Sequence, residues 1–124
     1  MSDFMTDLLA VARPVNDGCL AFMDNSGACL GFIQLIPGSG NGIVIHRLWT
    51  LQSGNGNGSK MLRQLCDIAD RHGAEITLKV TPFGRKPYPL TTEHLAAWYA
   101  RHGFVGNRRK MVRKPRVTSD QMTR

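Results

Sequence analysis

The feature that most constrains the fold is a glycine-spaced loop between an expected strand and an expected helix. The loop reads Ser-Gly-Asn-Gly-Asn-Gly-Ser over residues 53–59, between a β-branched run at residues 43–50 and an amphipathic pattern at residues 59–72. Glycine permits a positive φ and lets a ligand approach the backbone closely. The first turn of a helix leaves N–H groups unpaired and carries partial positive charge, which favours an anion. The loop therefore predicts a site for a phosphate-bearing ligand.

Two common phosphate-binding loops do not fit this spacing. A P-loop needs Gly-Lys followed by Ser or Thr, whereas Ser59 separates Gly58 from Lys60 and no hydroxyl residue follows the lysine. The Rossmann fingerprint needs Gly-x-Gly-x-x-Gly, and Gly54, Gly56 and Gly58 do not have that spacing. A flexible Asn/Gly turn without a ligand is the remaining alternative.

The rest of the chain reads as one domain of alternating strands and helices. Turn residues separate three expected strands, which form a meander over residues 19–24, 28–36 and 43–50. After the loop and its helix, a βαβ crossover predicts a parallel strand. The later elements are this strand at residues 75–80, a proline-containing loop at 81–91, a helix from Thr91 or Thr92, and a strand at about 104–112. Residues 1–17 predict a short helix closed by Pro14, and residues 115–124 a polar tail.

Composition bounds the class of protein. The chain of 124 residues is long enough for one domain with a core, and no apolar run approaches the ~20 residues of a membrane span. Three widely spaced cysteines form no metal pattern and suggest a reducing compartment. Because the N-terminus contains Asp3 and Asp7 and lacks a basic region, we expect no signal peptide and a cytoplasmic location.

Positive charge is concentrated near the C-terminus. The net charge is +7, and residues 108–116 contain much of the excess. We expect Arg109 and Arg113, in one strand, to contact an acidic partner or a nucleic acid. The alternative is a solvated edge strand whose charges discourage edge pairing.

Two motifs resemble those of the GNAT superfamily of N-acyltransferases. The family's coenzyme A loop is usually Arg or Gln, two residues, Gly, one residue, then Gly or Ala; here Gly56 and Gly58 take the small positions, and Ser53 replaces Arg or Gln. The run Trp-Tyr-Ala-Arg-His-Gly-Phe at residues 98–104 resembles the family's Tyr-x-Lys/Arg-x-Gly-Phe element. The resemblance covers about residues 18–114, and the chain also looks like the compact GNAT proteins of bacteriophage genomes.

The resemblance implies a fold and an activity. The fold would be α/β (α+β), with a mixed, mostly antiparallel sheet, flanking helices and an N-terminal helical roof that is reduced or supplied by a second subunit of a homodimer. The activity would be direct transfer of acetyl from acetyl-CoA to a primary amine without a metal. The acceptor could be a protein lysine, a small amine or a modified base. The alternative is a catalytically weak GNAT-fold module that binds an acidic host protein or a nucleic acid.

The resemblance also implies roles for particular residues. Tyr99 would protonate the departing sulfur, although a core aromatic is the alternative reading. His46 lies four residues before Thr50, which predicts the same strand face, and would accept the amine proton; the alternative is a half-buried strand histidine. Contacts to the coenzyme are expected from the strand end and the loop, namely Leu48, Trp49, Thr50, Leu51, Ser53, Gly54, Asn55, Gly56, Asn57, Gly58 and Ser59.

Overall fold

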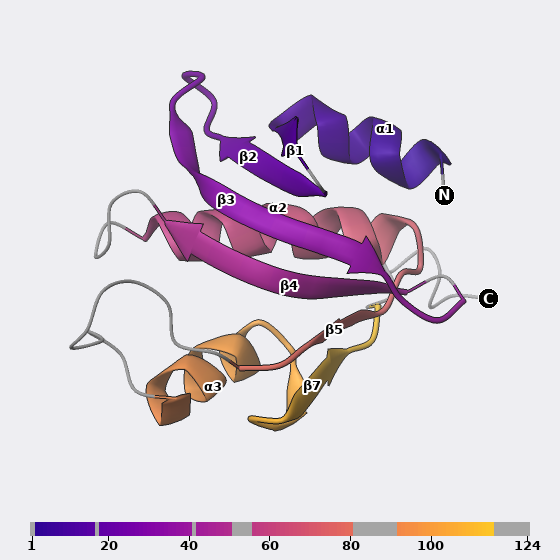
Figure 1. The fold of residues 1–124 in the computed structure, drawn as a ribbon, viewed down its shortest axis with the longest axis vertical. Coiled ribbons are helices and arrows are strands. Elements are labelled where there is room, and N and C mark those ends of the chain that lie inside the picture. Colours follow the sequence, from indigo (N-terminus) through magenta and orange to yellow (C-terminus); the bar gives the residue numbers. More distant parts are fainter. Residues whose placement is uncertain (1, 17, 41, 51–55, 81–91, 116–124) are drawn as a thin grey trace, which may run out of the picture.

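A seven-stranded sheet with helices packed on it organises the part of the chain that the computed structural model describes, residues 2–16, 18–40, 42–50, 56–80 and 92–115 (Figure 1). The elements in chain order are α1 (Ser2–Val11), β1 (Ala12–Asn16), β2 (Cys19–Met23), β3 (Cys29–Pro37), β4 (Ile43–Thr50), α2 (Asn57–Arg71), β5 (Ile76–Leu78), α3 (Thr92–Arg101), β6 (Val105–Asn107) and β7 (Lys110–Arg113). The strand order is β1-β2-β3-β4-β5-β7-β6, and of the strand pairs described only β4 and β5 run parallel. This arrangement confirms the expected mixed, mostly antiparallel sheet.

Helix α2 covers one face of the sheet and contributes much of the core. Its apolar positions recur with helical spacing, and Met61, Leu62 and Leu65 are fully buried. The helix lies so close to β3 that a Cβ on Gly31 would stand 2.8 Å from the Met61 sulfur. Helix α1 packs beside α2, where His72 Nε2 lies 2.7 Å from Asp7 Oδ2. In Figure 1, α2 lies behind β3 and β4.

The N-terminal segment differs from the expectation of one helix closed by Pro14. Helix α1 ends at Val11, and residues 12–16 form β1, which pairs with β2 at one edge of the sheet. Proline lacks a backbone N–H and is therefore tolerated in an edge strand, where one side of the strand makes no ladder bonds. Pro14 opposes Leu20, and the pairing register shifts after it. The meander thus has four strands rather than three, and the N-terminal roof is a single ten-residue helix.

The expectation of a single C-terminal strand at about residues 104–112 is also wrong, because this segment forms a hairpin of two strands, β6 and β7. The backbone N–H groups of Arg109 and Lys110 both donate to Asn107 Oδ1, at 2.9 and 3.3 Å. These two hydrogen bonds stabilise the turn between β6 and β7. Strand β7 then pairs with β5 on its other side, so the edge strand is β6.

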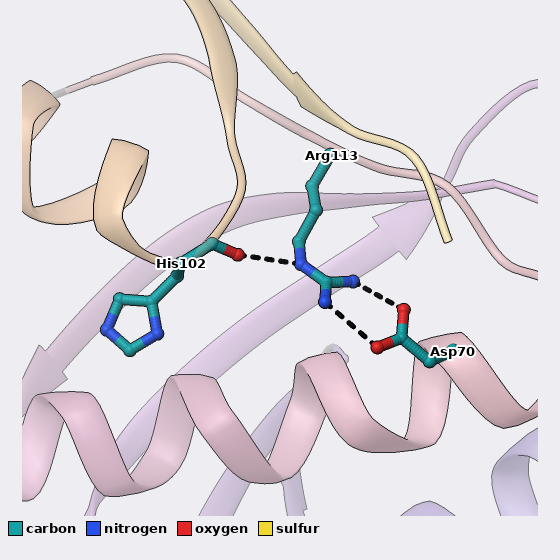
Figure 2. A network of polar contacts seen from close by, with 3 residues as sticks. All are labelled: Asp70, His102 and Arg113. Atoms are coloured by element: carbon teal, nitrogen blue, oxygen red, sulfur yellow. Dashed lines mark hydrogen bonds and ion pairs between the residues drawn. The ribbon is translucent and has the colours of Figure 1, made fainter. Parts of the chain in front are cut away.

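The prediction that Arg113 contacts a partner is wrong, because its side chain is only 3% exposed. Its Nη1 and Nη2 donate to Asp70 Oδ1 and Oδ2 of α2 at 2.7 and 2.9 Å, and its Nε donates to the His102 carbonyl at 2.8 Å (Figure 2). The guanidinium thus joins β7, α2 and the C-terminal end of α3. Arg109, in contrast, is exposed on the hairpin turn.

Candidate functional site

Strands β4 and β5 pair at one end and separate at the other. The described pairing joins residues 43–45 of β4 to residues 76–78 of β5, whereas β4 continues to Thr50 along β3. Figure 1 shows the two ribbons diverging toward the end of β4. Beyond Ile45, the backbone groups on this side of β4 therefore pair with none of the described strands, which leaves a gap between β4 and β5 among the described residues.

A β-bulge lies at the point where the two strands separate. Ile45 pairs with Leu35 and Arg47 pairs with Gln34, so His46 is the extra residue. The extra residue reverses the alternation of faces: Ile45 and Leu48 are both buried, whereas His46 and Arg47 are both exposed. The expectation that His46 shares the face of Thr50 is therefore wrong, because it assumed uninterrupted alternation. Bulges often redirect side chains beside active sites, so a role for His46 as a base is kept as a prediction.

The N-terminus of α2 lies beside the end of β4. Gly56 is the N-cap residue, with a φ of 74°, and no side chain caps this helix end. Lys60 N–H donates to the Gly56 carbonyl at 3.1 Å, which leaves the N–H groups of Asn57, Gly58 and Ser59 without an acceptor inside the helix. A left-handed glycine, N–H groups that have no acceptor inside the helix and the positive end of a 15-residue helix together form a cradle suited to a phosphate.

Helix α3 contacts this cradle through the side chain of Trp98. The indole Nε1 donates to Ser59 Oγ at 2.8 Å. A Cβ on Gly58 would stand 3.3 Å from both the Trp98 ring and Thr50 Cγ2. Gly58 therefore fits between the end of β4 and α3, so its small size is needed for packing as well as for any ligand.

Tyr99, the expected general acid, is buried in α3. Its side chain is 6% exposed and packs edge-on against Phe104, with ring centroids 5.5 Å apart. Burial raises the pKa of the Tyr99 phenol, because the charged phenolate would be poorly solvated. The phenol is therefore protonated throughout the physiological pH range, and the raised pKa also makes it a weaker acid than an exposed tyrosine.

The predicted coenzyme contacts fall into two groups. Leu48, Trp49, Thr50, Gly56, Asn57, Gly58 and Ser59 lie on the splayed half of β4 or at the start of α2. Leu51, Ser53, Gly54 and Asn55 lie outside the described residues. In the first group, Leu48 is buried on the face of the sheet that α2 covers, and Trp49 lies on the opposite face. The predicted contacts on β4 are therefore divided between the two faces of the sheet.

Two cations near the cradle were not singled out from the sequence. Lys60 and Arg63 are exposed on the first turns of α2 and line a polar hollow of about 470 Å³ with Gln64 and the turn at Asp24. The spacing i, i+3 places both on one side of a helix, which was a usable signal. Ser26 Oγ and the backbone N–H groups of Ser26 and Ala28 donate to Asp24 Oδ1, and these bonds lower the pKa of that carboxyl.

A second hollow, of about 400 Å³, lies at the far end of the sheet. Its lining is mostly apolar and comes from α1, from β1 to β3 and from the turn before β4. It contains none of the predicted site residues, so we do not assign the chemistry to it. Among the residues that the structure describes, no group of His, Cys, Asp and Glu could hold a metal ion. None of the described helices is long and apolar enough to cross a membrane.

No family model and no curated protein matches the sequence, but solved structures match the fold. The GNAT-family N-acetyltransferase YhbS from Escherichia coli, solved with CoA, has a TM-score of 0.53 and 15% identity over 91% of this chain and 66% of its own. The PaiA N-acetyltransferase from Thermoplasma acidophilum, solved with coenzyme A, has a TM-score of 0.52 and 20% identity over 77% of this chain and 59% of its own. This chain has the GNAT fold.

The anti-CRISPR protein AcrVA5 is a further match of similar size. Its TM-score is 0.56 and its identity 20%, over 77% of this chain and 97% of its own. The chain spans less than two thirds of the PaiA enzyme but nearly all of AcrVA5.

Proposed function

We propose that this protein is an acyl-CoA-dependent N-acyltransferase that transfers acetyl from acetyl-CoA to a primary amine. The observation that carries the proposal is the gap between β4 and β5, which leads to a helix N-terminus capped by Gly56 rather than by a side chain. The gap exposes β4 backbone N–H groups suited to a thioester carbonyl and an amide-containing arm. The helix start offers N–H groups and positive charge to a pyrophosphate.

The residues divide the chemistry among them. Acetyl-CoA supplies an activated acyl group whose bond to sulfur breaks as the amine nitrogen bonds to the carbonyl carbon. Backbone N–H groups of β4 stabilise the oxyanion, and Tyr99 donates its proton to the departing sulfur. His46, exposed at the bulge, accepts the proton that the amine loses. No covalent enzyme intermediate is required.

One observation favours the alternative of a GNAT-fold binding module. The Tyr99 ring is packed against Phe104 and 6% exposed, as a purely structural aromatic would be. In the binding module the coenzyme would be bound weakly or not at all, and Tyr99 would serve only the core. Calorimetric titration with acetyl-CoA separates the two functions.

A matched pair of glycine variants tests the site itself. Gly56 and Gly73 stand at opposite ends of α2, have φ of 74° and 64°, and have no atom within 4 Å of an added Cβ. Alanine at either position should cost about 1 kcal/mol of stability, because both positions are left-handed. We expect Gly56→Ala to weaken acetyl-CoA binding at least about tenfold, since its methyl group enters the phosphate cradle. Gly73→Ala should bind normally. Equal affinities in the two variants would place the coenzyme elsewhere.

A further inference from the structure

One face of the four-stranded meander carries none of the described helices. Alternation along the strands places Phe22, Ile33 and Leu48 on the face that α2 covers, where all three are buried. The residues next to each of them along its strand lie on the opposite face of the sheet. Helices α1 and α3 both contact α2, through Asp7 and Trp98 respectively, and so do not cover the opposite face of β2–β4. Figure 1 shows β3 and β4 unobstructed on the side away from α2.

An aromatic pair lies on this uncovered face. Phe32 of β3 and Trp49 of β4 are cross-strand partners, and their rings stack with centroids 5.2 Å apart and an interplanar angle of 28°. Both side chains are half-buried. Trp49 lies on the splayed half of β4, so the pair stands beside the gap in the sheet.

Arginines flank the pair on two sides. The register joins Arg13, Ala21, Phe32 and Trp49 into one row across four strands. The exposed Arg13 is two strand spacings, about 10 Å, from Phe32, and the buried Ala21 lies between them. Arg47 is exposed two residues before Trp49 on the same strand and face.

No acidic residue balances these cations within the sheet. None of the seven described strands contains Asp or Glu. The uncovered face instead adds the titratable His46 at the bulge and, because Met111 and Arg113 are buried on the α2 side, the exposed Lys110 of β7. The face therefore combines positively charged side chains with a half-buried aromatic pair.

We propose that this face, defined by Arg13, Phe32, Arg47 and Trp49, binds single-stranded nucleic acid. Bases stack on the aromatic pair, and the two guanidinium groups contact phosphates. A second copy of the chain is a poor occupant, because two such faces would bring arginines against arginines. An acidic protein would satisfy the arginines but would not use a stacked aromatic pair.

This inference goes beyond the proposed acyl transfer and does not depend on it. Nucleic acid binding would be measured without acetyl-CoA, and the surface lies on the side of the sheet opposite α2. If acyl transfer also occurs, an amine on or near the bound nucleic acid would reach the gap between β4 and β5.

The test is fluorescence anisotropy with a labelled single-stranded oligothymidylate of about ten nucleotides at several salt concentrations. Trp49→Leu should weaken binding about five- to a hundredfold, the scale of losing one base stack, and leave the salt dependence unchanged. Arg47→Gln and Arg13→Gln should each weaken binding and reduce the slope of log K against log salt by about 0.7. Both arginines are exposed, so these two variants leave the core intact.

Arg63→Gln is the matched control, because it removes one exposed charge from α2, on the opposite side of the sheet. It should bind the oligonucleotide as the unaltered protein does. The proposal is overturned if the unaltered protein does not bind, or if Arg63→Gln weakens binding as much as Arg47→Gln. It is also overturned if polyglutamate competes equally well and Trp49→Leu has no effect, which would identify an acidic protein surface as the partner.

Discussion

At the scale of single residues, the environment of a side chain decides which chemistry it can supply. Tyr99, the candidate acid, is buried among aromatic rings, and burial raises its pKa, so its phenol stays protonated. His46, the candidate base, is exposed at a bulge. The two candidate groups therefore lie in different environments, one buried and one exposed.

Replacing the Tyr99 hydroxyl tests the acid role directly. Tyr99→Phe retains the ring that packs on Phe104 and removes only the proton donor. We expect kcat to fall about 100-fold while acetyl-CoA affinity is unchanged, the usual scale of general acid catalysis. Steady-state kinetics combined with calorimetry would show this. A variant with full kcat would make Tyr99 a packing residue only.

At the scale of elements, two polar contacts hold α3 against α2. Trp98 bonds to Ser59 at the start of α2, and Arg113 joins Asp70, near the end of α2, to the His102 carbonyl just after α3. The contacts lie at opposite ends of α2, so together they fix the direction in which α3 approaches the cradle. The orientation of α3 beside the cradle therefore depends partly on the Arg113–Asp70 pair, which lies outside the candidate site.

Breaking the ion pair should destabilise the whole domain. Asp70→Ala leaves the Arg113 guanidinium buried without its carboxylate, and we expect a loss of about 3–5 kcal/mol in the free energy of unfolding. Asp67→Ala removes an exposed carboxylate from the same helix and should change stability by less than about 0.5 kcal/mol. Urea denaturation measures both. Similar midpoints for the two variants would contradict a structural role for the pair.

At the scale of the whole molecule, groups with shifted pKa values set the pH range of stability. The pKa of Asp24 is lowered mainly by the hydrogen bond from Ser26, so its contribution is present above about pH 4 and is lost as pH falls through the lowered pKa. Burial raises the pKa of Cys19 and of Tyr99. Their contribution is present below the pKa of the unfolded chain and is lost as pH rises toward the raised values.

We therefore expect the free energy of unfolding to be greatest between about pH 4 and pH 9 and to fall on both sides. Chemical denaturation from about pH 2 to about pH 11 would measure the profile on both sides of this range. The double variant Cys19→Ala, Tyr99→Phe should have a shallower alkaline decline, because neither side chain then ionises on unfolding. An unchanged decline would assign it to other groups.

Sequence alone determined the features that depend on near neighbours along the chain. The strands of residues 19–50 and helix α2 follow from alternation and helical spacing, both of which act over a few residues. The same local patterns carried the resemblance that predicted the GNAT fold. The Asn107 turn was also a local signal, and treating residues 104–112 as one strand missed it.

Only the tertiary structure decided the features that join distant residues. Pairing of Arg47 with Gln34 created the bulge that reversed the face of His46, and pairing with β2 made residues 12–16 a strand despite Pro14. The buried bond from Arg113 to Asp70 spans 43 positions, and charge counting had treated this arginine as exposed. Strand register, burial and ion pairing depend on which segments meet across the sheet, and a short stretch of sequence does not contain that information.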